Sequence, residues 1–274
     1  MIGYPNAKIN LGLQILNKRS DGFHNLESVF IPLKLADILE VIPNYAENEN
    51  KSTLYQSGIK LDASPEQNMV MKAFNLLKSD FELPSVQIAL HKIVPFGSGL
   101  GGGSSDAASI VLMLDRLFNL DLSIEKKKYY LEILGSDCPF FLSNSVSFVS
   151  GRGEKYEPIL LDMKGVYLVI IVPNVNINTG EAFRLINPTN SEYSLREKLK
   201  NPMEEWKTNI FNDFEKVLFP KYPILQEIKG KLYELGAKYV SLSGSGSSIY
   251  GFFNTEFNPQ EHFPGLFTWT ERFE

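Results

Sequence analysis

Residues 95–106 read PFGSGLGGGSSD, in which five glycines and three serines fall within twelve positions. So few side chains cannot build a core, but glycine reaches left-handed conformations cheaply, which lets neighbouring backbone N–H groups converge. At the start of a helix such N–H groups form a site for an anion, most often phosphate. The stretch therefore predicts an enzyme that handles phosphate. We call residues 95–105 the glycine-rich loop.

The segments on either side of the glycine-rich loop predict a strand followed by a helix. Residues 85–93 alternate between apolar and polar side chains, which is typical of a strand with one buried face. Residues 104–118 place apolar side chains from Ala107 to Phe118 along one stripe, the spacing of an amphipathic helix. The loop is therefore expected to lead directly into a helix N-terminus, whose backbone N–H groups have no partners within the helix.

Two other phosphate-binding loops share part of this pattern. The stretch from Gly97 to Gly102 satisfies G-x-G-x-x-G, but dinucleotide-binding folds place an acid on a strand about 20 residues later. Here Asp121 begins another helical segment instead. The P-loop has Lys after its last glycine, whereas the last glycine here is followed by Ser104. A flexible surface turn remains the alternative to a phosphate site.

Periodicity elsewhere predicts a mixture of strands and helices in two domains. The expected strands are 7–15, 28–35, 38–42, 166–172, 239–242 and 248–253, and the further helices are 68–78, 123–134 and 224–235. Residues 18–26 are expected to form a polar loop, and SGSGS at 243–247 a hairpin turn. We expect one domain over residues 1–155, which contains the glycine-rich loop, and a second over residues 156–274.

Composition narrows the class of protein. The 274 residues carry a formal net charge of -5 and are 43% hydrophobic, which suits a globular enzyme and disfavours nucleic-acid binding. Cys138 is the one cysteine, so an intramolecular disulfide is excluded and a reducing compartment is expected. No apolar run approaches the roughly 20 residues of a membrane span, and the start lacks a secretory signal pattern. We therefore expect a cytoplasmic protein that does not bind membranes.

Four further polar residues stand out, but pattern alone gives each an ordinary role. Lys8 and Asn10 alternate with the apolar residues of the first strand, which predicts a solvated strand face. Asp137 lies in a turn, where it would cap backbone groups. His24 is a lone histidine in a polar loop, and such residues are more often structural than catalytic. Two glycine/serine turns in one chain favour a shared anion without proving it.

Three segments together resemble the GHMP kinase superfamily: PNAKINLGL at residues 5–13, PFGSGLGGGSSDAA at 95–108 and SLSGSGSS at 241–248. Four more segments are similar to the branch of that superfamily that phosphorylates CDP-methylerythritol: RSDGFHNLESVF at 19–30, LGSDCPFF at 134–141, GRGE at 151–154 and PNVNINTGEAF at 173–183. The resemblance spans nearly the whole chain, with all segments in the expected order.

The resemblance implies an α+β fold of two domains. The N-terminal α/β domain would contain a left-handed β-α-β crossover, and the C-terminal domain would be ferredoxin-like. It further implies that ATP donates its γ-phosphoryl group to the tertiary 2-hydroxyl of CDP-methylerythritol, a step of non-mevalonate isoprenoid synthesis. The partners would be ATP and this small-molecule substrate, with Mg²⁺ carried by the nucleotide rather than by protein ligands. The chain would act as a monomer or weak homodimer.

The resemblance also assigns roles to individual residues. Lys8 and Asp137 match the catalytic lysine and aspartate of the superfamily. The nucleotide-binding residues would be Pro95, Phe96, Gly97, Ser98, Gly99, Leu100, Gly101, Gly102, Gly103, Ser104 and Ser105, together with Asn68 and Lys92. The acceptor-binding residues would be Asn10, Phe23, His24, Thr179 and Phe183, with His24 reading the cytosine.

Departures from the usual pattern leave alternatives open. Phe23 stands where many relatives have Tyr, which keeps a stacking ring but loses a hydroxyl. Asp106 stands where Asn is also found, which adds negative charge close to the phosphate site. A kinase of the same superfamily that acts on mevalonate, homoserine or a sugar is the nearest alternative, and the run from Asp21 to His24 argues against it. A catalytically inactive sensor of the same fold is less favoured, because Lys8 and Asp137 are both present.

Overall fold

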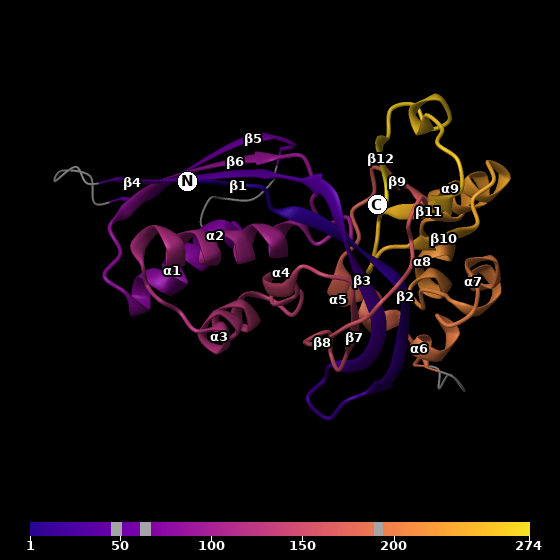
Figure 1. Ribbon diagram of the computed structural model, residues 1–274. Coiled ribbons are helices and arrows are strands. Elements are labelled where there is room, and N and C mark those ends of the chain that lie inside the picture. The colour runs from indigo at the N-terminus through magenta and orange to yellow at the C-terminus, as the bar shows by residue number, and fades with distance from the viewer. Residues whose placement is uncertain (45–50, 61–66, 189–193) are drawn as a thin grey trace. The chain divides into compact units, whose positions relative to one another are not determined.

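The computed structural model describes residues 1–44, 51–60, 67–188 and 194–274. These residues form two compact units that interleave along the chain (Figure 1). The first unit comprises Met1–Lys8, Pro32–Phe96 and Gly101–Ser145, and the second comprises Ile9–Ile31, Gly97–Leu100 and Val146–Glu274. The glycine-rich loop therefore passes from the first unit into the second and back. The domain boundary expected after residue 155 stays a prediction.

The first unit is built on a four-stranded sheet of order β1-β4-β6-β5. Strands β1 (Ile2–Gly3), β4 (Ile38–Asn44) and β6 (Ser85–Lys92) pair antiparallel, whereas β5 (Thr53–Gly58) pairs parallel to β6. Helix α1 (Met69–Asp80) lies between β5 and β6 in the chain, as a parallel pair requires. Strand β5 was not predicted, because its polar sequence TLYQSG belongs to a largely exposed edge strand and lacks alternation.

Helices cover one face of this sheet (Figure 1). They are α1, α2 (Gly102–Phe118), α3 (Ile124–Leu134) and the short α4 (Phe140–Ser143). The predicted helices at 68–78, 104–118 and 123–134 are confirmed within two residues at each end. Asn68 caps α1 by accepting the N–H of Val70, and Ser123 caps α3 by accepting the N–H of Lys126. Helix α2 is the continuation of the glycine-rich loop.

The second unit contains two antiparallel sheets. One has the order β2-β3-β7-β8, formed by β2 (Asn6–Lys18), β3 (His24–Ala36), β7 (Ser147–Ser150) and β8 (Lys155–Pro158). The first residues of β2 and the last of β3 belong to the first unit. The loop predicted over 18–26 is shorter than expected, because β3 already begins at His24.

The other sheet of the second unit has the order β10-β11-β9-β12. Its strands are β9 (Tyr167–Val172), β10 (Tyr239–Leu242), β11 (Ile249–Phe253) and β12 (Phe267–Arg272), and every pair is antiparallel. Helices connect β9 to β10 in the chain, and with that connection the strand order is the one expected of a ferredoxin-like sheet. Strand β12 was not predicted, because its sequence FTWTER ends in two charged residues and Glu271 shares the face of Phe267 and Trp269.

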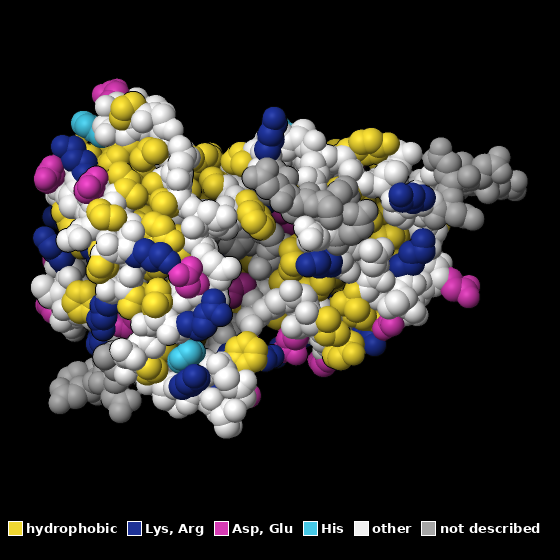
Figure 2. Space-filling view, turned by 180° about the vertical axis from the view of Figure 1, so that it is seen from behind, with side chains coloured by type: hydrophobic (Ala, Val, Ile, Leu, Met, Phe, Trp, Pro, Cys, Tyr) yellow, Lys and Arg dark blue, Asp and Glu magenta, His cyan; other side chains and the backbone are white. Residues whose placement is uncertain are grey.

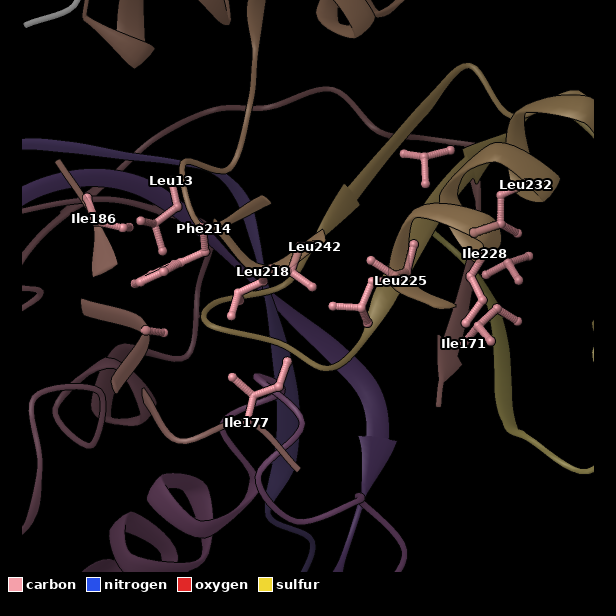
Figure 3. Close-up of a cluster of buried hydrophobic side chains, with 14 of the residues drawn as sticks. Leu13, Ile171, Ile177, Ile186, Phe214, Leu218, Leu225, Ile228, Leu232 and Leu242 are labelled. Carbon is pink, nitrogen blue, oxygen red and sulfur yellow. The ribbon is translucent and has the colours of Figure 1, made fainter. Parts of the chain in front are cut away.

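The helices of the second unit are α5 (Thr179–Leu185), α6 (Leu195–Lys198), α7 (Met203–Asn209), α8 (Glu215–Lys221) and α9 (Pro223–Glu234), followed by a 3₁₀ turn at Pro259–Glu261. An apolar cluster packs α5, α8 and α9 against this sheet (Figure 3). Leu225, Ile228 and Leu232 form the buried stripe of α9. Leu13 of β2 and Leu242 of β10 join the same cluster, which holds the two sheets of this unit together.

The surface matches the composition. On the face shown in Figure 2, Lys and Arg side chains are interspersed with Asp and Glu rather than gathered in a stripe. Among the described residues, no helix is both long and apolar enough to cross a lipid bilayer.

Candidate active site

The N-terminus of α2 has the geometry of an anion site. Gly101 is the N-cap residue and adopts a left-handed conformation with φ of 73°, and no side chain caps the helix. The first turn holds no acidic side chain. The N–H groups of this turn therefore remain available to a ligand, and the helix dipole adds about half a positive charge there.

Lys8 and Asp137 form an ion pair in the first unit. The Lys8 Nζ lies 3.1 Å from Asp137 Oδ2, with side chains that are 3% and 36% exposed respectively. A Cβ on Gly101 would lie 3.0 Å from both Cγ and Cε of Lys8, so the lysine stem packs against the N-cap of α2. The two residues matched to catalytic positions are therefore brought together. Of the two side chains, that of Asp137 is the one accessible to solvent.

The expectation of a solvated face for Lys8 and Asn10 was wrong. Both side chains are buried, because nearly every residue of β2 from Ala7 to Gln14 is covered. A buried lysine needs a compensating charge. The partner of Lys8 lies more than a hundred residues away in the chain, so local alternation could not reveal it.

A second buried lysine lies directly behind the first turn of α2. The Lys92 Nζ donates to Asp37 Oδ2 and, at 2.8 Å, to Asp106 Oδ2. Asp37 Oδ1 accepts the backbone N–H groups of Ile93 and Val94, at 2.6 and 2.8 Å. A Cβ on Gly102 would lie 3.3 Å from the Lys92 Nζ. We call Asp37, Lys92 and Asp106 the buried triad.

The buried triad changes the interpretation of Lys92. This residue was expected to touch the nucleotide, but its ammonium group is buried and already engaged by two carboxylates. Burial acts to lower the pKa of Lys92, and the two carboxylates more than offset it, so its pKa is raised. Asp37 was missed, because it is a single polar residue between strands β3 and β4 with no motif around it.

The second unit brings the glycine-rich loop against the SGSGS turn. Gly99 has φ of 80°, and a Cβ there would lie 2.0 Å from the carbonyl oxygen of Ser243. The Ser243 Oγ donates to Gly99 O at 2.9 Å, and the Ser248 N–H donates to Ser98 O at 2.9 Å. The predicted hairpin turn is confirmed, and the two glycine/serine turns are in direct contact.

The SGSGS turn is held from behind by a residue that sequence reasoning missed. Asn212 is buried, and its Nδ2 donates to Leu242 O at 2.8 Å and to Gly244 O at 2.7 Å. Its Oδ1 accepts the backbone N–H of Phe214 at 3.0 Å. The first two bonds hold the turn that contacts Gly99, and the third orients the Asn212 side chain. An asparagine beside an aspartate in FNDFE carries no distinctive spacing, so nothing in the sequence marked it.

His24 and Phe183 lie face to face in the second unit. Their ring centroids are 5.6 Å apart with an interplanar angle of 19°, and Phe183 packs edge-on against the buried Phe214 at 4.9 Å. Partial burial, together with the charge of Lys18, lowers the pKa of His24 below its ordinary value. The imidazole is therefore neutral at pH 7, with one nitrogen that donates and one that accepts. Both residues were predicted to bind the acceptor.

The other predicted acceptor residues lie in the same unit. Phe23 is 50% exposed, and the Arg152 guanidinium lies 5.2 Å from its ring centroid. The Thr179 Oγ1 is 2.8 Å from Ser245 Oγ, which links the start of α5 to the SGSGS turn. Asn10 is buried, with its Nδ2 donating to Ser28 Oγ at 3.0 Å and its backbone N–H donating to Ser243 Oγ at 3.2 Å.

The remaining residues that were predicted to bind the nucleotide are either exposed or have structural roles. Phe96 is 68% exposed, which leaves its ring open to a planar ligand. Asn68 caps α1. Met69, the residue after Asn68, lies beside the glycine-rich loop, since a Cβ on Gly103 would lie 3.7 Å from Met69 Cγ. The other loop residues not yet placed are the partly buried Pro95 and Ser104, the exposed Gly97, and the buried Leu100 and Ser105.

Comparisons with known proteins agree along the chain. The family model described as the GHMP kinases N terminal domain matches residues 68–144, and the one described as GHMP kinases C terminal matches residues 194–261. The 4-diphosphocytidyl-2-C-methyl-D-erythritol kinase of Bacteroides fragilis is 49% identical over 257 residues, which is 93% of each chain. The corresponding kinase of Parabacteroides distasonis is 42% identical over 271 residues, which is 98% of each chain.

A solved structure supports the same family assignment. A crystal structure of 4-(cytidine 5'-diphospho)-2C-methyl-D-erythritol kinase superposes with a TM-score of 0.76 at 31% identity, and covers 92% of this chain and 89% of its own. The two-domain α+β fold expected from the sequence is confirmed. The chain belongs to the GHMP kinases and, within them, to the family of the 4-diphosphocytidyl-2-C-methyl-D-erythritol kinases.

Proposed function

We propose that this protein transfers the γ-phosphoryl group of ATP to the 2-hydroxyl of 4-diphosphocytidyl-2-C-methyl-D-erythritol. The observation that carries the proposal is the Lys8–Asp137 pair, 3.1 Å across, packed beside the uncapped N-terminus of α2. Identity above 40% to 4-diphosphocytidyl-2-C-methyl-D-erythritol kinases supports the choice of acceptor. We further expect a cytoplasmic enzyme that acts as a monomer or weak homodimer.

Nucleotide binding would use backbone groups more than side chains. The N–H groups of the glycine-rich loop and of the first turn of α2 would hold the β- and γ-phosphates. Magnesium, when bound, neutralises phosphate charge that develops during transfer. Among the described residues no cluster of three His, Cys, Asp or Glu side chains occurs, and the carboxylates nearest this helix end are paired with lysines. We therefore propose that magnesium is held mainly by the nucleotide itself.

Lys8 and Asp137 would divide the chemistry of transfer. The acceptor is a tertiary alcohol, far too weak an acid to lose its proton before the reaction begins. We propose that Asp137 accepts a hydrogen bond from this hydroxyl, which orients its oxygen toward phosphorus, and takes the proton late, as the P–O bond forms. The Lys8 ammonium would stabilise negative charge on the transferring group and hold Asp137 in position.

The acceptor's base would be recognised in the second unit. A neutral His24 offers one donor and one acceptor to the Watson–Crick edge of cytosine, and its stacking on Phe183 sets the plane of the ring. Phe23 supplies an exposed ring for stacking. Asn10 and Thr179 lie next to the SGSGS turn in this unit and would contact the rest of the acceptor.

Replacing His24 with Gln is expected to raise KM for the cytidine-containing acceptor by about 10- to 100-fold, because one specific base contact is worth about 1–3 kcal/mol. KM for ATP should change less than threefold. Initial rates with each substrate varied in turn measure both constants. The matched control is His262→Gln, which changes the histidine that contacts Phe257 elsewhere in the same unit. Equal effects of both variants on acceptor KM would remove His24 from base recognition.

A panel of acceptors tests the proposed function directly. Mg-ATP is supplied with CDP-methylerythritol, mevalonate, homoserine or galactose, and ADP release is measured. We expect turnover with CDP-methylerythritol at least a hundredfold above the others. Turnover with mevalonate or homoserine alone would move the protein to another branch of the superfamily, and nucleotide binding without turnover of any acceptor would favour a sensor.

A further inference from the structure

The buried triad carries one more carboxylate than ammonium. Asp37, Lys92 and Asp106 are all nearly inaccessible to solvent, and Lys92 supplies the single positive charge for two acids. The two oxygens of Asp37 and one of Asp106 have partners. The other oxygen, Asp106 Oδ1, is buried without a hydrogen-bond partner. A buried charge without compensation is energetically unfavourable. Protonation of Asp106 would remove this excess charge, because Asp106 is the triad member with an oxygen that lacks a partner.

Asp106 lies close enough to the uncapped end of α2 for its protonation to affect a ligand bound there. Asp106 is the fifth residue of α2, so only about 6 Å of helix axis separates it from Gly102 at the uncapped end. Lys92 reaches the same first turn from β6, and Asp37, which lies between β3 and β4, pairs with the Lys92 ammonium. A polyphosphate bound at this end would add negative charge close to the carboxylate that already lacks compensation.

We propose that Asp106 takes up a proton when the nucleotide's phosphates bind at the N-terminus of α2, so that the buried triad becomes neutral behind the bound polyanion. Asp106 is in this sense a positioning residue for the phosphate site, since it does not touch the phosphates itself. This inference rests on the proposed function, because it takes the N-terminus of α2 as the place where the phosphates bind.

The charged neighbours of Asp106 agree with this assignment. Burial, followed by the opposing effect of Lys92 and the added effect of Asp37, raises the pKa of Asp106 to about 7. Lys8 and Asp137 form their own pair beside Gly101. Cys138 is hydrogen-bonded to the Ser104 side chain, and burial raises the pKa of its thiol to about 12, so it keeps its proton. Asp106 can therefore exchange a proton near neutral pH, whereas Cys138 cannot.

The sign of the pH dependence follows from linkage. A bound polyanion raises the pKa of Asp106 further, so the complex holds more protons than the free enzyme over roughly pH 7 to 8.5. Nucleotide binding in that range must then take up protons, and affinity must weaken as pH rises. Below about pH 6, Asp106 is protonated in both states and contributes nothing.

Calorimetric titration of Mg-ADP into the wild-type enzyme at pH 7.8 tests the proposal. The phosphates are already ionised at this pH, so an observed binding enthalpy that differs between HEPES and Tris buffers measures protons taken up by the protein. We expect about half a proton per nucleotide. Asp106→Asn should abolish this uptake and flatten the decline of affinity between pH 7 and 8.5.

A matched variant separates the triad from a general loss of charge on the helix. Asp115→Asn removes a carboxylate near the other end of α2, where its Oδ2 pairs with Lys127 at 2.8 Å. Its pKa is lowered, so it carries no proton to exchange near pH 7.8. This variant should keep the wild-type proton uptake.

The outcomes are distinct. Uptake that is absent in the wild type, or that persists in Asp106→Asn, would overturn the proposal, and the wild-type measurement decides this even if a variant fails to fold. Binding without uptake leaves the proposed function standing. Failure of Mg-ADP to bind the wild-type enzyme at all would overturn the proposed function instead.

Discussion

Asp137→Asn is expected to lower kcat by about 10²- to 10⁴-fold, the range that a positioned general base contributes. The substitution keeps the shape of the side chain but removes both the negative charge that holds Lys8 and the ability to accept a proton. Because this contribution arises in the transition state, kcat and kcat/KM should fall together, with KM for each substrate changed less than fivefold. Steady-state ADP release with both substrates varied measures these constants.

The control for this variant is Asp80→Asn. Asp80 also belongs to the first unit and also lies near a lysine, with its Oδ2 3.7 Å from Lys126 Nζ. Its side chain contacts Ser79, Tyr130 and Lys126, none of which is a predicted site residue. It should retain wild-type kcat. If Asp137→Asn turned over at close to the wild-type rate, Asp137 would have no part in the chemistry.

Gly99→Ala is expected to lower kcat/KM for ATP by about 100-fold, the cost of misplacing a substrate-positioning group by roughly 1 Å. Two effects act at once. Alanine disfavours the left-handed φ of 80°, and its Cβ would lie 2.0 Å from the backbone oxygen of Ser243, which cannot move aside as a flexible side chain could. The glycine-rich loop must therefore shift away from the SGSGS turn. Initial rates with ATP varied at saturating acceptor measure the effect.

Gly236→Ala separates the steric effect from the conformational one. Gly236 has φ of 97°, but no atom lies within 4 Å of the position a Cβ would take. This control should lose about 1–2 kcal/mol of stability from backbone strain and keep wild-type kinetics. Equal kinetics in the Gly99 and Gly236 variants would show that contact between the two turns does not position ATP.

Local patterns predicted the elements that build the phosphate site. Alternation over 85–93 and helical spacing over 104–118 correctly placed β6 and α2 around the glycine-rich loop. The reason is physical, since these segments each bury one face within their own unit, and burial of one face imposes the period of the element on the sequence. The glycines themselves could be interpreted because a left-handed N-cap such as Gly101 strongly favours that residue.

Elements without a one-sided apolar face escaped prediction. Strand β5 is a mostly exposed edge strand, and the short strands β7 and β8 offer only four residues each. Helix α5 follows an asparagine cap at Asn178, yet its seven residues bury only Ala182 completely. Such short segments depend on tertiary packing rather than on their own periodicity.

The chemistry of the site could be predicted only in part, because its charges are paired over long distances in the chain. Pattern alone made Lys8 a solvated residue, and only resemblance to the GHMP kinases identified it and Asp137. The structure brings the two together, since the ammonium is buried and the carboxylate compensates it. Asp37 and Asn212 had no local signal at all, because each acts through backbone groups and side chains far away in the sequence.

This enzyme is expected to form a phosphate monoester on the tertiary 2-hydroxyl of CDP-methylerythritol. Phosphorus NMR of the product made from Mg-ATP and this acceptor shows which hydroxyl carries the new phosphate. We predict one new monoester resonance that is not split by protons, because C2 bears no hydrogen, alongside an intact diphosphate. A monoester resonance split by carbon-bound protons would place the phosphate on another hydroxyl, and absence of any new resonance would contradict the account.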